Sequence, residues 1–410
     1  MSQSHSSESR LPWLREQAIR QSGVRDVFTP STPISKVRSL VGRDREVLKI
    51  TQAIDTPGQH VLLYGERGVG KSSLANVAAY ISGNSADLKL YEKACDRTDT
   101  FVSILLEALK AVGADMVLRN VTKDKNRGGK VEGKYVLGAS VEASRGESRT
   151  YESMEALSPS AVATVIAVHP GLLVIDELDA IKNAERWKIA ELMKILSDMD
   201  SAFKILIVGV AETGSELTSA HPSVPRCLRE IKLGRISDSE LRNIVTGGAE
   251  RVHLQFDESV IDAIVELSDG YPHFTHLLAL KCAELALGAG ARVVSRTHLD
   301  EALVLAVEDS EGTLRRSYEE ATRSATPKYR TILSAAAALG SGEFTASALR
   351  GKIEDLTGES VTQNSLNNSF QRLVSRDGST VLRRTGIGIY RFEDPRMASF
   401  IRIANKMLPR

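Results

Sequence analysis

Eight consecutive residues, Gly65-Glu-Arg-Gly-Val-Gly-Lys-Ser72, constrain this chain more than any other segment. They fit the pattern GxxxxGK[ST], in which glycines let the backbone wrap a phosphate while its N–H groups point inward. An apolar run at His60–Tyr64 predicts a strand before this segment, and Lys71–Ser82 predicts a helix after it. That strand–loop–helix context favours a phosphate-binding loop over a chance glycine turn.

The pattern assigns roles to the residues of this loop and to an acidic pair downstream. Lys71 would reach the β- and γ-phosphates of a nucleotide, and the Ser72 hydroxyl would be a ligand of Mg²⁺. The second half of the site is Leu172-Leu-Val-Ile-Asp-Glu177, where Asp176 would hold the metal and Glu177 would act as the general base. The nucleotide-binding residues expected on the loop are Gly65, Glu66, Arg67, Gly68, Val69, Gly70, Lys71, Ser72 and Ser73.

The rest of the chain predicts an α/β fold with two further domains. Near-continuous Leu/Ile/Val runs at Leu172–Ile175 and Lys204–Val208 are typical of parallel strands covered on both faces. Four helical windows follow in residues 238–308, with Ser237, Asp257, Asp269 and Ser295 or Thr297 as their expected caps. The predicted organisation is a tail and short helix at 1–33, a core at 34–236 with an insertion at 119–152, an all-helical lid at 237–308, a linker helix at 309–326 and a winged helix-turn-helix domain at 327–410.

Charge is divided unevenly along the chain. The formal net charge is +1, but residues 323–410 hold 14 Lys or Arg against 7 Asp or Glu, which leaves about −6 for the remainder. The helix expected after Thr362 and the hairpin after it carry side chains of the types that read base edges and bind phosphates. The residues expected to face DNA are Gln363, Asn364, Asn367, Asn368, Arg372, Arg383 and Arg384. Sequence-specific DNA reading, non-specific DNA contact and docking of a protein all remain open.

Two absences limit the classes of protein. No uninterrupted apolar run approaches the roughly 18–20 residues that a membrane span needs, and no apolar segment in the first residues indicates a secretory signal. The three cysteines are far apart in the sequence and fit neither a disulfide framework nor a zinc site. We therefore expect a cytoplasmic protein without membrane partners.

With these motifs in place, the sequence resembles the AAA+ ATPases, and in particular their initiator and archaeal/bacterial-ATPase branch. The similar segments begin with Leu40-Val-Gly-Arg-Asp-Arg-Glu46 and the phosphate loop, and continue with Ile175-Asp-Glu-Leu-Asp179, Val208-Gly-Val-Ala-Glu-Thr213 and Gly270-Tyr-Pro-His-Phe-Thr275. The resemblance implies ATP and Mg²⁺ as ligands and an ATP hydrolase activity that is slow and stimulated by assembly or a partner.

The resemblance also implies roles for residues outside the two motifs. Val41 and Gly42 would lie against the adenine base, and Thr213 or Glu212 would contact the γ-phosphate or the water. Arg226 would reach into the site of a neighbouring subunit, with Arg229 as the alternative. His273 stands where this branch often has a nucleotide-sensing arginine. Because a neutral histidine binds phosphate more weakly than arginine does, coupling of the lid to ATP would be weaker.

Two functions follow from these expectations. In the first, a homo-oligomer hydrolyses ATP at inter-subunit sites and couples hydrolysis to DNA-associated assembly, as in replication, transposition or defence against mobile elements and phages. In the second, the chain is a nucleotide-dependent switch that recruits a separate effector protein, with little turnover and no direct DNA binding.

Overall fold

The computed structural model describes residues 12–113, 158–209, 224–310, 312–323, 328–340, 342–374 and 381–406. The insertion expected at 119–152 lies outside the described residues, as do Thr213 and its alternative Glu212. Contacts divide the chain into two units: an α/β unit of residues 35–65 and 71–233, and a helical unit of residues 1–34, 66–70 and 234–410.

The α/β unit is built on a five-stranded parallel sheet with the order β2-β3-β4-β1-β5. The strands are β1 (His60–Gly65), β2 (Lys89–Ala94), β3 (Gly171–Asp176), β4 (Phe203–Gly209) and β5 (Leu228–Leu233). Every residue of β4 is buried, as is all of β3 except Asp176. This burial accounts for their unbroken apolar sequences, because a parallel sheet is covered on both faces. The predicted α/β fold class is confirmed.

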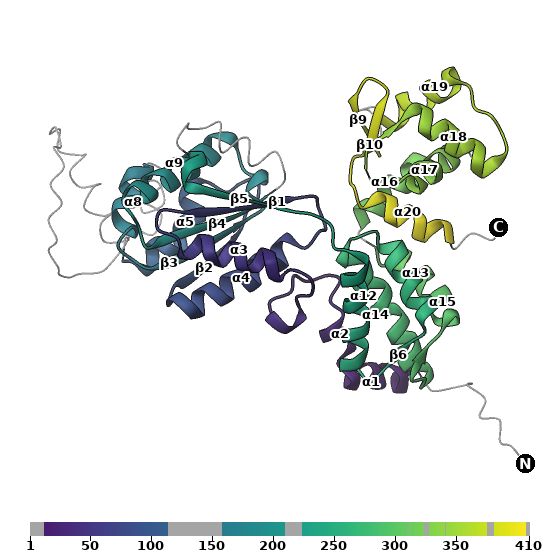
Figure 1. The fold of residues 1–410 in the computed structure, drawn as a ribbon, viewed down its shortest axis with the longest axis horizontal. Helices are drawn as coiled ribbons and strands as arrows, with labels where there is room; N and C mark the ends of the chain where they lie inside the picture. Colours follow the sequence, from purple (N-terminus) through teal and green to yellow (C-terminus); the bar gives the residue numbers. More distant parts are fainter. Residues whose placement is uncertain are drawn as a thin grey trace, which may run out of the picture. The chain divides into compact units, whose positions relative to one another are not determined.

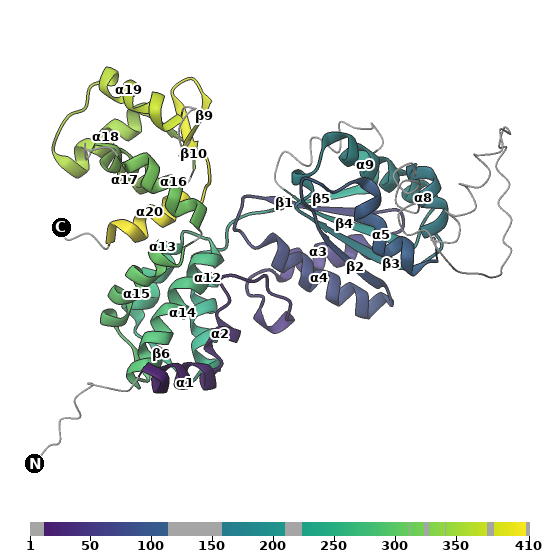
Figure 2. The same cartoon turned by 180° about the vertical axis from the view of Figure 1, so that it is seen from behind.

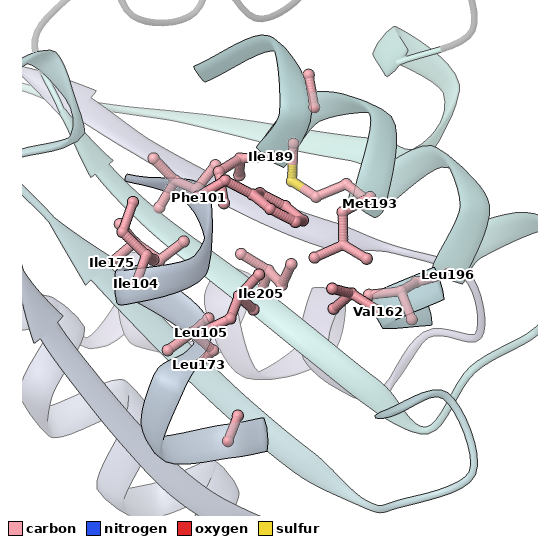
Figure 3. Packing of buried hydrophobic residues seen from close by; sticks show 14 of the residues in the cluster. Phe101, Ile104, Leu105, Val162, Leu173, Ile175, Ile189, Met193, Leu196 and Ile205 are labelled. Atoms are coloured by element: carbon pink, nitrogen blue, oxygen red, sulfur yellow. The ribbon is translucent and has the colours of Figure 1, made fainter. Parts of the chain in front are cut away.

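Helices cover both faces of this sheet (Figure 1). On one face lie α3 (Asp44–Asp55) and α4 (Lys71–Ala86), and on the other lie α5 (Phe101–Ala111), α8 (Pro159–Ile166) and α9 (Asn183–Asp198). Figure 3 shows the second layer, where Phe101, Ile189 and Met193 pack over side chains of β3 and β4 such as Leu173 and Ile205. Burial of large apolar side chains on this scale is the main favourable term in folding such a unit.

Residues 237–308, predicted as a lid and called the lid here, contain the four helices expected from the sequence: α12 (Asp238–Arg251), α13 (Glu258–Ser268), α14 (Pro272–Ala289) and α15 (Arg296–Glu308). Ser237 starts α12 with a reciprocal capping box to Glu240. The structure adds a short parallel pair, β6 (Gln255–Phe256) with β7 (Val293–Val294), that was not predicted. It also corrects one cap, because Asp269 ends α13 in a left-handed conformation and Tyr271 precedes α14.

The N-terminal segment packs on this lid. It forms α1 (Pro12–Ser22) and α2 (Val24–Val27), which contact α14. Phe28 is buried against Gly248 of α12, where a Cβ would collide with its ring. Arg25 pairs with Glu284 of α14 at 2.6 Å and with Glu16 at 2.7 Å. The segment is therefore part of the packed helical unit.

The C-terminal part, called here the C-terminal domain, spans the described residues between 312 and 406 (Figure 2). Its helices are α16 (Gly312–Thr322), α17 (Lys328–Ala338), α18 (Ala346–Thr357), α19 (Gln363–Val374) and α20 (Met397–Lys406). Its antiparallel sheet has the order β8-β10-β9, with β8 (Phe344–Thr345), β9 (Leu382–Gly386) and β10 (Ile389–Phe392). Phe370 of α19 stacks on Tyr390 of β10 at 3.9 Å between ring centroids. The assignment of this domain as a winged helix remains a prediction.

Two further findings concern the described residues as a whole. None of the helices described is long and apolar enough to cross a membrane. Cys95, Cys227 and Cys282 are each buried as free thiols, and burial raises the pKa of Cys95 to about 12.

Candidate nucleotide site

The two ends of the phosphate loop, residues 65–72, are fixed within the α/β unit. β1 ends at Gly65, where a Cβ would run into the carbonyl oxygen of Leu233 on the neighbouring strand β5. α4 begins at Lys71, whose Nζ donates to the Gly65 carbonyl oxygen at 3.1 Å. Lys71 therefore folds back across the loop that it closes. An ammonium group in this place suits a phosphate oxygen.

The loop tip, residues 66–70, has two positions with a backbone conformation that only glycine adopts readily. Gly68 has φ +85° and Gly70 has φ +95°, in the left-handed region that strains other residues. Between them, Val69 is fully buried and anchors the tip. Glycines at these two positions let a loop present successive backbone N–H groups to one anion. The donor set and the backbone both fit the phosphates of ATP.

The acidic pair follows the carboxyl end of β3. Strand order places β3 beside β4 and β4 beside β1, so Asp176 and Gly65 end strands at the same edge of the sheet. The Asp176 Oδ1 accepts a hydrogen bond from the Glu177 backbone N–H at 2.8 Å. Glu177 adopts φ +55°, a conformation rare for a residue with a side chain. Such outliers persist where the surroundings enforce them, and they cluster at functional sites.

This arrangement provides groups with separate chemical tasks. Lys71 can neutralise phosphate charge, and the exposed Glu177 carboxylate can orient a water and take its proton. Mg²⁺ is usually held by one or two protein groups together with phosphate oxygens, so Ser72 and Asp176 fit its needs and the metal would neutralise charge on the phosphates. The arrangement suits phosphoryl transfer to water, in which positioning and electrostatics carry most of the catalysis.

Other residues of the helical unit contact the loop tip, which belongs to that unit. The Glu66 Oε2 accepts hydrogen bonds from the Arg235 Nε at 3.1 Å and from the Tyr271 hydroxyl at 2.8 Å. The Arg235 guanidinium also lies 4.8 Å from the centroid of the Tyr271 ring. Burial opposes the charge on Arg235, yet its pKa is raised above the ordinary value by Tyr271 and the two neighbouring carboxylates. On the other flank, a Cβ at Gly68 would lie 2.5 Å from the Arg396 Cδ.

Other predicted site residues occupy separate places in the α/β unit. Val41 and Gly42 lie just before Arg43, the N-cap of α3, and Gly42 has a left-handed conformation with φ +72°. Arg226 lies in the short helix α11 (Val224–Cys227), is exposed, and donates to Asp198 of α9 at 2.9 Å. Its alternative, Arg229, is exposed on β5. Roles for these residues remain predictions.

His273 forms a contact that the sequence did not suggest. Its Nδ1 lies 2.9 Å from the carbonyl oxygen of Pro30, in the N-terminal segment. Nearby, the Thr29 backbone N–H donates to the His276 Nδ1 at 3.2 Å. Burial, with a smaller contribution from His273, lowers the pKa of His276 to about 4, so this ring is neutral at pH 7. Both histidines thus bind the N-terminal segment, and a nucleotide-sensing role for His273 remains a prediction.

Comparison with known proteins agrees with this geometry. Residues 39–208 match the family model of the AAA ATPase domain. A search of curated proteins found no match. Among solved structures, the chain is similar to a Walker-type ATPase of Pyrococcus abyssi, with 17% identity, a TM-score of 0.50, and coverage of 91% of this chain and 99% of that one.

Two other solved structures are more distant in shape. The Orc1 protein of Aeropyrum pernix, solved in complex with DNA, has 17% identity and a TM-score of 0.47, with 93% of this chain and 95% of that chain covered. The RuvB Holliday junction branch migration motor of Thermotoga maritima has 15% identity and a TM-score of 0.44, with 88% and 96% covered. The family match agrees with the predicted P-loop AAA+ ATPase domain over residues 39–208, and an ATPase domain is what the predicted ATP hydrolase activity requires.

No role was predicted for Arg235, Tyr271 or Arg396 from the sequence. Tyr271 lies in the segment Gly270-Tyr-Pro-His-Phe-Thr275 that supported the family resemblance, but neither Tyr271 nor Arg235 belongs to a motif of its own. Arg396 follows β10, the last strand of the C-terminal sheet. The signal that could have found it is Asp394-Pro-Arg396, in which a rigid turn places a carboxylate beside an arginine.

Proposed function

We propose that this chain, which carries an AAA ATPase domain at residues 39–208, binds ATP with Mg²⁺ on its phosphate loop and hydrolyses ATP with Glu177 as general base. The chain acts in a homo-oligomer, in which Arg226 completes the site of a neighbouring subunit. Hydrolysis is coupled to a DNA-associated assembly through the basic C-terminal domain.

One observation carries the enzymatic part of this proposal. Lys71 folds over the phosphate loop, while Glu177 lies in an enforced left-handed conformation at the same edge of the sheet. The Asp176 Oδ1 holds the Glu177 backbone by a hydrogen bond. A cation for phosphate and a carboxylate for water therefore both lie at the edge of the sheet formed by the carboxyl ends of the strands, where open α/β sheets bind their ligands.

The DNA part rests on the exposed face of α19 and on the β9–β10 hairpin. One face of α19 is buried and consists of Leu366, Phe370 and Leu373. The opposite face is rich in amide side chains and is exposed to solvent. The exposed residues of this face are Gln363, Asn364, Asn367 and Asn368, with Arg372 at the end of the helix. Arg383 and Arg384 are exposed on β9, and Arg384 donates to the Gly386 carbonyl at 3.1 Å. Amides that can read bases and arginines that can bind phosphates thus share one domain.

Fluorescence anisotropy with a labelled DNA duplex, measured over a salt series, tests this part. Removing phosphate contacts lowers the slope of log affinity against log salt by about 0.9 for each contact. The double variant Arg383→Ala with Arg384→Ala should therefore flatten the slope by about 2. The matched control is Arg315→Ala with Arg316→Ala, two exposed arginines of α16. No DNA affinity in the wild type, or equal slopes in both double variants, would contradict DNA binding by this hairpin.

A second function, a nucleotide switch that recruits an effector, is favoured by the bonds from Glu66 of the loop tip to Arg235 and Tyr271. A switch needs a nucleotide site that is tied to a movable part. Mass photometry with ATP and with ADP, each with and without DNA, distinguishes the two functions. Assembly that requires ATP and forms on DNA supports the first, whereas ATP-dependent assembly that ignores DNA supports the second.

A further inference from the structure

The loop tip touches the C-terminal domain directly. Arg396 lies between β10 and α20 and is 95% buried, since only 5% of its surface is exposed. Its Cδ and Cγ take up the space that a side chain at Gly68 would need. The Asp394 carboxylate fixes its guanidinium, accepting from Nε at 3.0 Å and from Nη2 at 2.7 Å. A bidentate pair of this kind sets the position of the arginine as well as stabilising it.

A chain of ion pairs makes a second connection between the loop tip and α20. Glu66 pairs with Arg235 at 3.1 Å, and Arg235 pairs with Asp269 at 3.2 Å. Asp269 in turn pairs with Arg402 of α20 at 2.7 Å. Close to this pair, the Ser399 hydroxyl of α20 donates to the Ser268 carbonyl at 3.4 Å. Asp269 can serve both arginines because it is the residue that ends α13, with φ +49°.

We propose that the C-terminal domain senses the nucleotide through the loop tip, with Arg396 against Gly68 and the pairs Glu66–Arg235–Asp269–Arg402 coupling phosphate binding to the seating of α20. This inference rests on the proposed nucleotide binding and adds a regulatory role for the C-terminal domain. Arg396 is a positioning residue in this scheme, because it acts on the loop that holds the phosphates.

Electrostatics gives the direction of the coupling. A triphosphate brings several negative charges to a loop tip that already carries the Glu66 carboxylate. Arg235 and Arg396 place two cations beside that tip, so the phosphates favour the arrangement in which both arginines are in place. By reciprocity, an α20 that is seated on the lid strengthens nucleotide binding by the same factor. ATP should therefore hold the C-terminal domain in place more firmly than ADP does.

The test uses the full chain, with a fluorescent, non-hydrolysable ATP analogue and the matching ADP probe in the presence of Mg²⁺. Titrations give the affinities, and hydrogen–deuterium exchange reports the protection of α20 with and without the analogue. Arg396→Ala should weaken binding of the ATP analogue about 10-fold, within the usual range for coupled sites. The same variant should remove the protection of α20 that the analogue induces, and Arg396→Lys should restore part of both effects.

Two further variants separate coupling from a general loss of structure. Arg402→Ala removes the far end of the ion-pair chain, so it should weaken binding about 3-fold while the melting temperature changes little. Arg316→Ala, an exposed arginine in the same domain, is the control and should behave like the wild type.

The outcomes distinguish this inference from the function on which it rests. A wild-type chain that binds neither probe would overturn both. A wild-type chain that binds ATP while exchange in α20 stays the same would overturn only the inference. Equal affinities in the wild type and the folded Arg396→Ala variant would do so as well.

Discussion

The two ends of the phosphate loop and its tip are held in different ways. The ends lie against backbone: Gly65 meets the carbonyl of Leu233, and Lys71 donates to the carbonyl of Gly65. The tip lies against side chains, since Glu66 binds Arg235 and Tyr271 while Gly68 lies against Arg396. A backbone carbonyl keeps its place as long as its strand is formed, whereas a side-chain partner can adopt another rotamer once its own contacts break. The ends are thus suited to holding the phosphate-binding groups in one geometry. The tip is suited to contacts that change when a nucleotide binds.

The largest effect should come from the cation at the end of the loop. Lys71→Ala removes the ammonium group that suits the phosphates, and a charge-assisted contact of this kind contributes about 3 kcal/mol. We expect nucleotide affinity to fall by about 100-fold or more in a fluorescence titration. Lys110→Ala, an exposed lysine of α5 in the same unit, is the control. Unchanged affinity in Lys71→Ala would remove this loop as the nucleotide site.

The next effect concerns folding at the fixed end. In Gly65→Ala the new methyl group meets the backbone oxygen of Leu233, which cannot move without distorting β5. We expect a loss of about 3 kcal/mol in the free energy of unfolding, measured by urea denaturation. A variant as stable as the wild type would show that the end of the loop is not held by backbone.

The next prediction concerns the pH dependence of the free energy of unfolding, which should show an effect of intermediate size from the buried His60. His60 begins β1, accepts from the Ile205 N–H at 3.0 Å, and has its Nε2 3.1 Å from the Met193 carbonyl. Burial, together with the nearby Lys204, lowers the pKa of His60 to about 3. Folded His60 therefore stays neutral below pH 6.5, where the unfolded chain takes up a proton, so stability is lost as pH falls.

Urea denaturation at several pH values measures this loss. Between pH 6.5 and 5, the wild-type free energy of unfolding should drop by up to about 2 kcal/mol because of this one group. His60→Gln cannot take up that proton, so its stability should change less with pH, whatever its stability at pH 7. Parallel pH profiles for the two proteins would contradict the assignment.

The smallest effect is expected at the tip. Gly68→Ala places a methyl group against the Arg396 side chain and strains a backbone at φ +85°. The strain should lower the free energy of unfolding by about 1 kcal/mol, less than Gly65→Ala does, and it should lower nucleotide affinity about 5-fold. If Gly68→Ala destabilises the fold as much as Gly65→Ala, the contrast between the ends and the tip does not hold.

The same contrast explains how far the sequence could predict the structure. The ends of the loop belong to local patterns: an apolar run gives β1, the glycines give the turn, and Lys71 begins α4 at its expected residue. The Leu/Ile/Val run before Asp176 likewise identified β3. These features need only neighbours in the sequence.

Contacts of the tip could not be predicted in this way. Glu66 and its partner Arg235 are 169 residues apart, and Glu66 and Tyr271 are 205 apart. Asp269 was expected to cap α14 but instead ends α13, and its carboxylate pairs with two arginines. Side-chain pairs between distant segments depend on the completed fold, so no local periodicity reports them.

The central claim is that this chain hydrolyses ATP with Glu177 as the base, and one paired measurement tests it most directly. Nucleotide affinity and steady-state phosphate release are measured for the wild type, Glu177→Gln and the control Glu191→Gln, an exposed glutamate of α9. Glu177→Gln should bind ATP as the wild type does, while its turnover falls about 100-fold or more. The control should match the wild type in both. Wild-type turnover in Glu177→Gln would contradict the account.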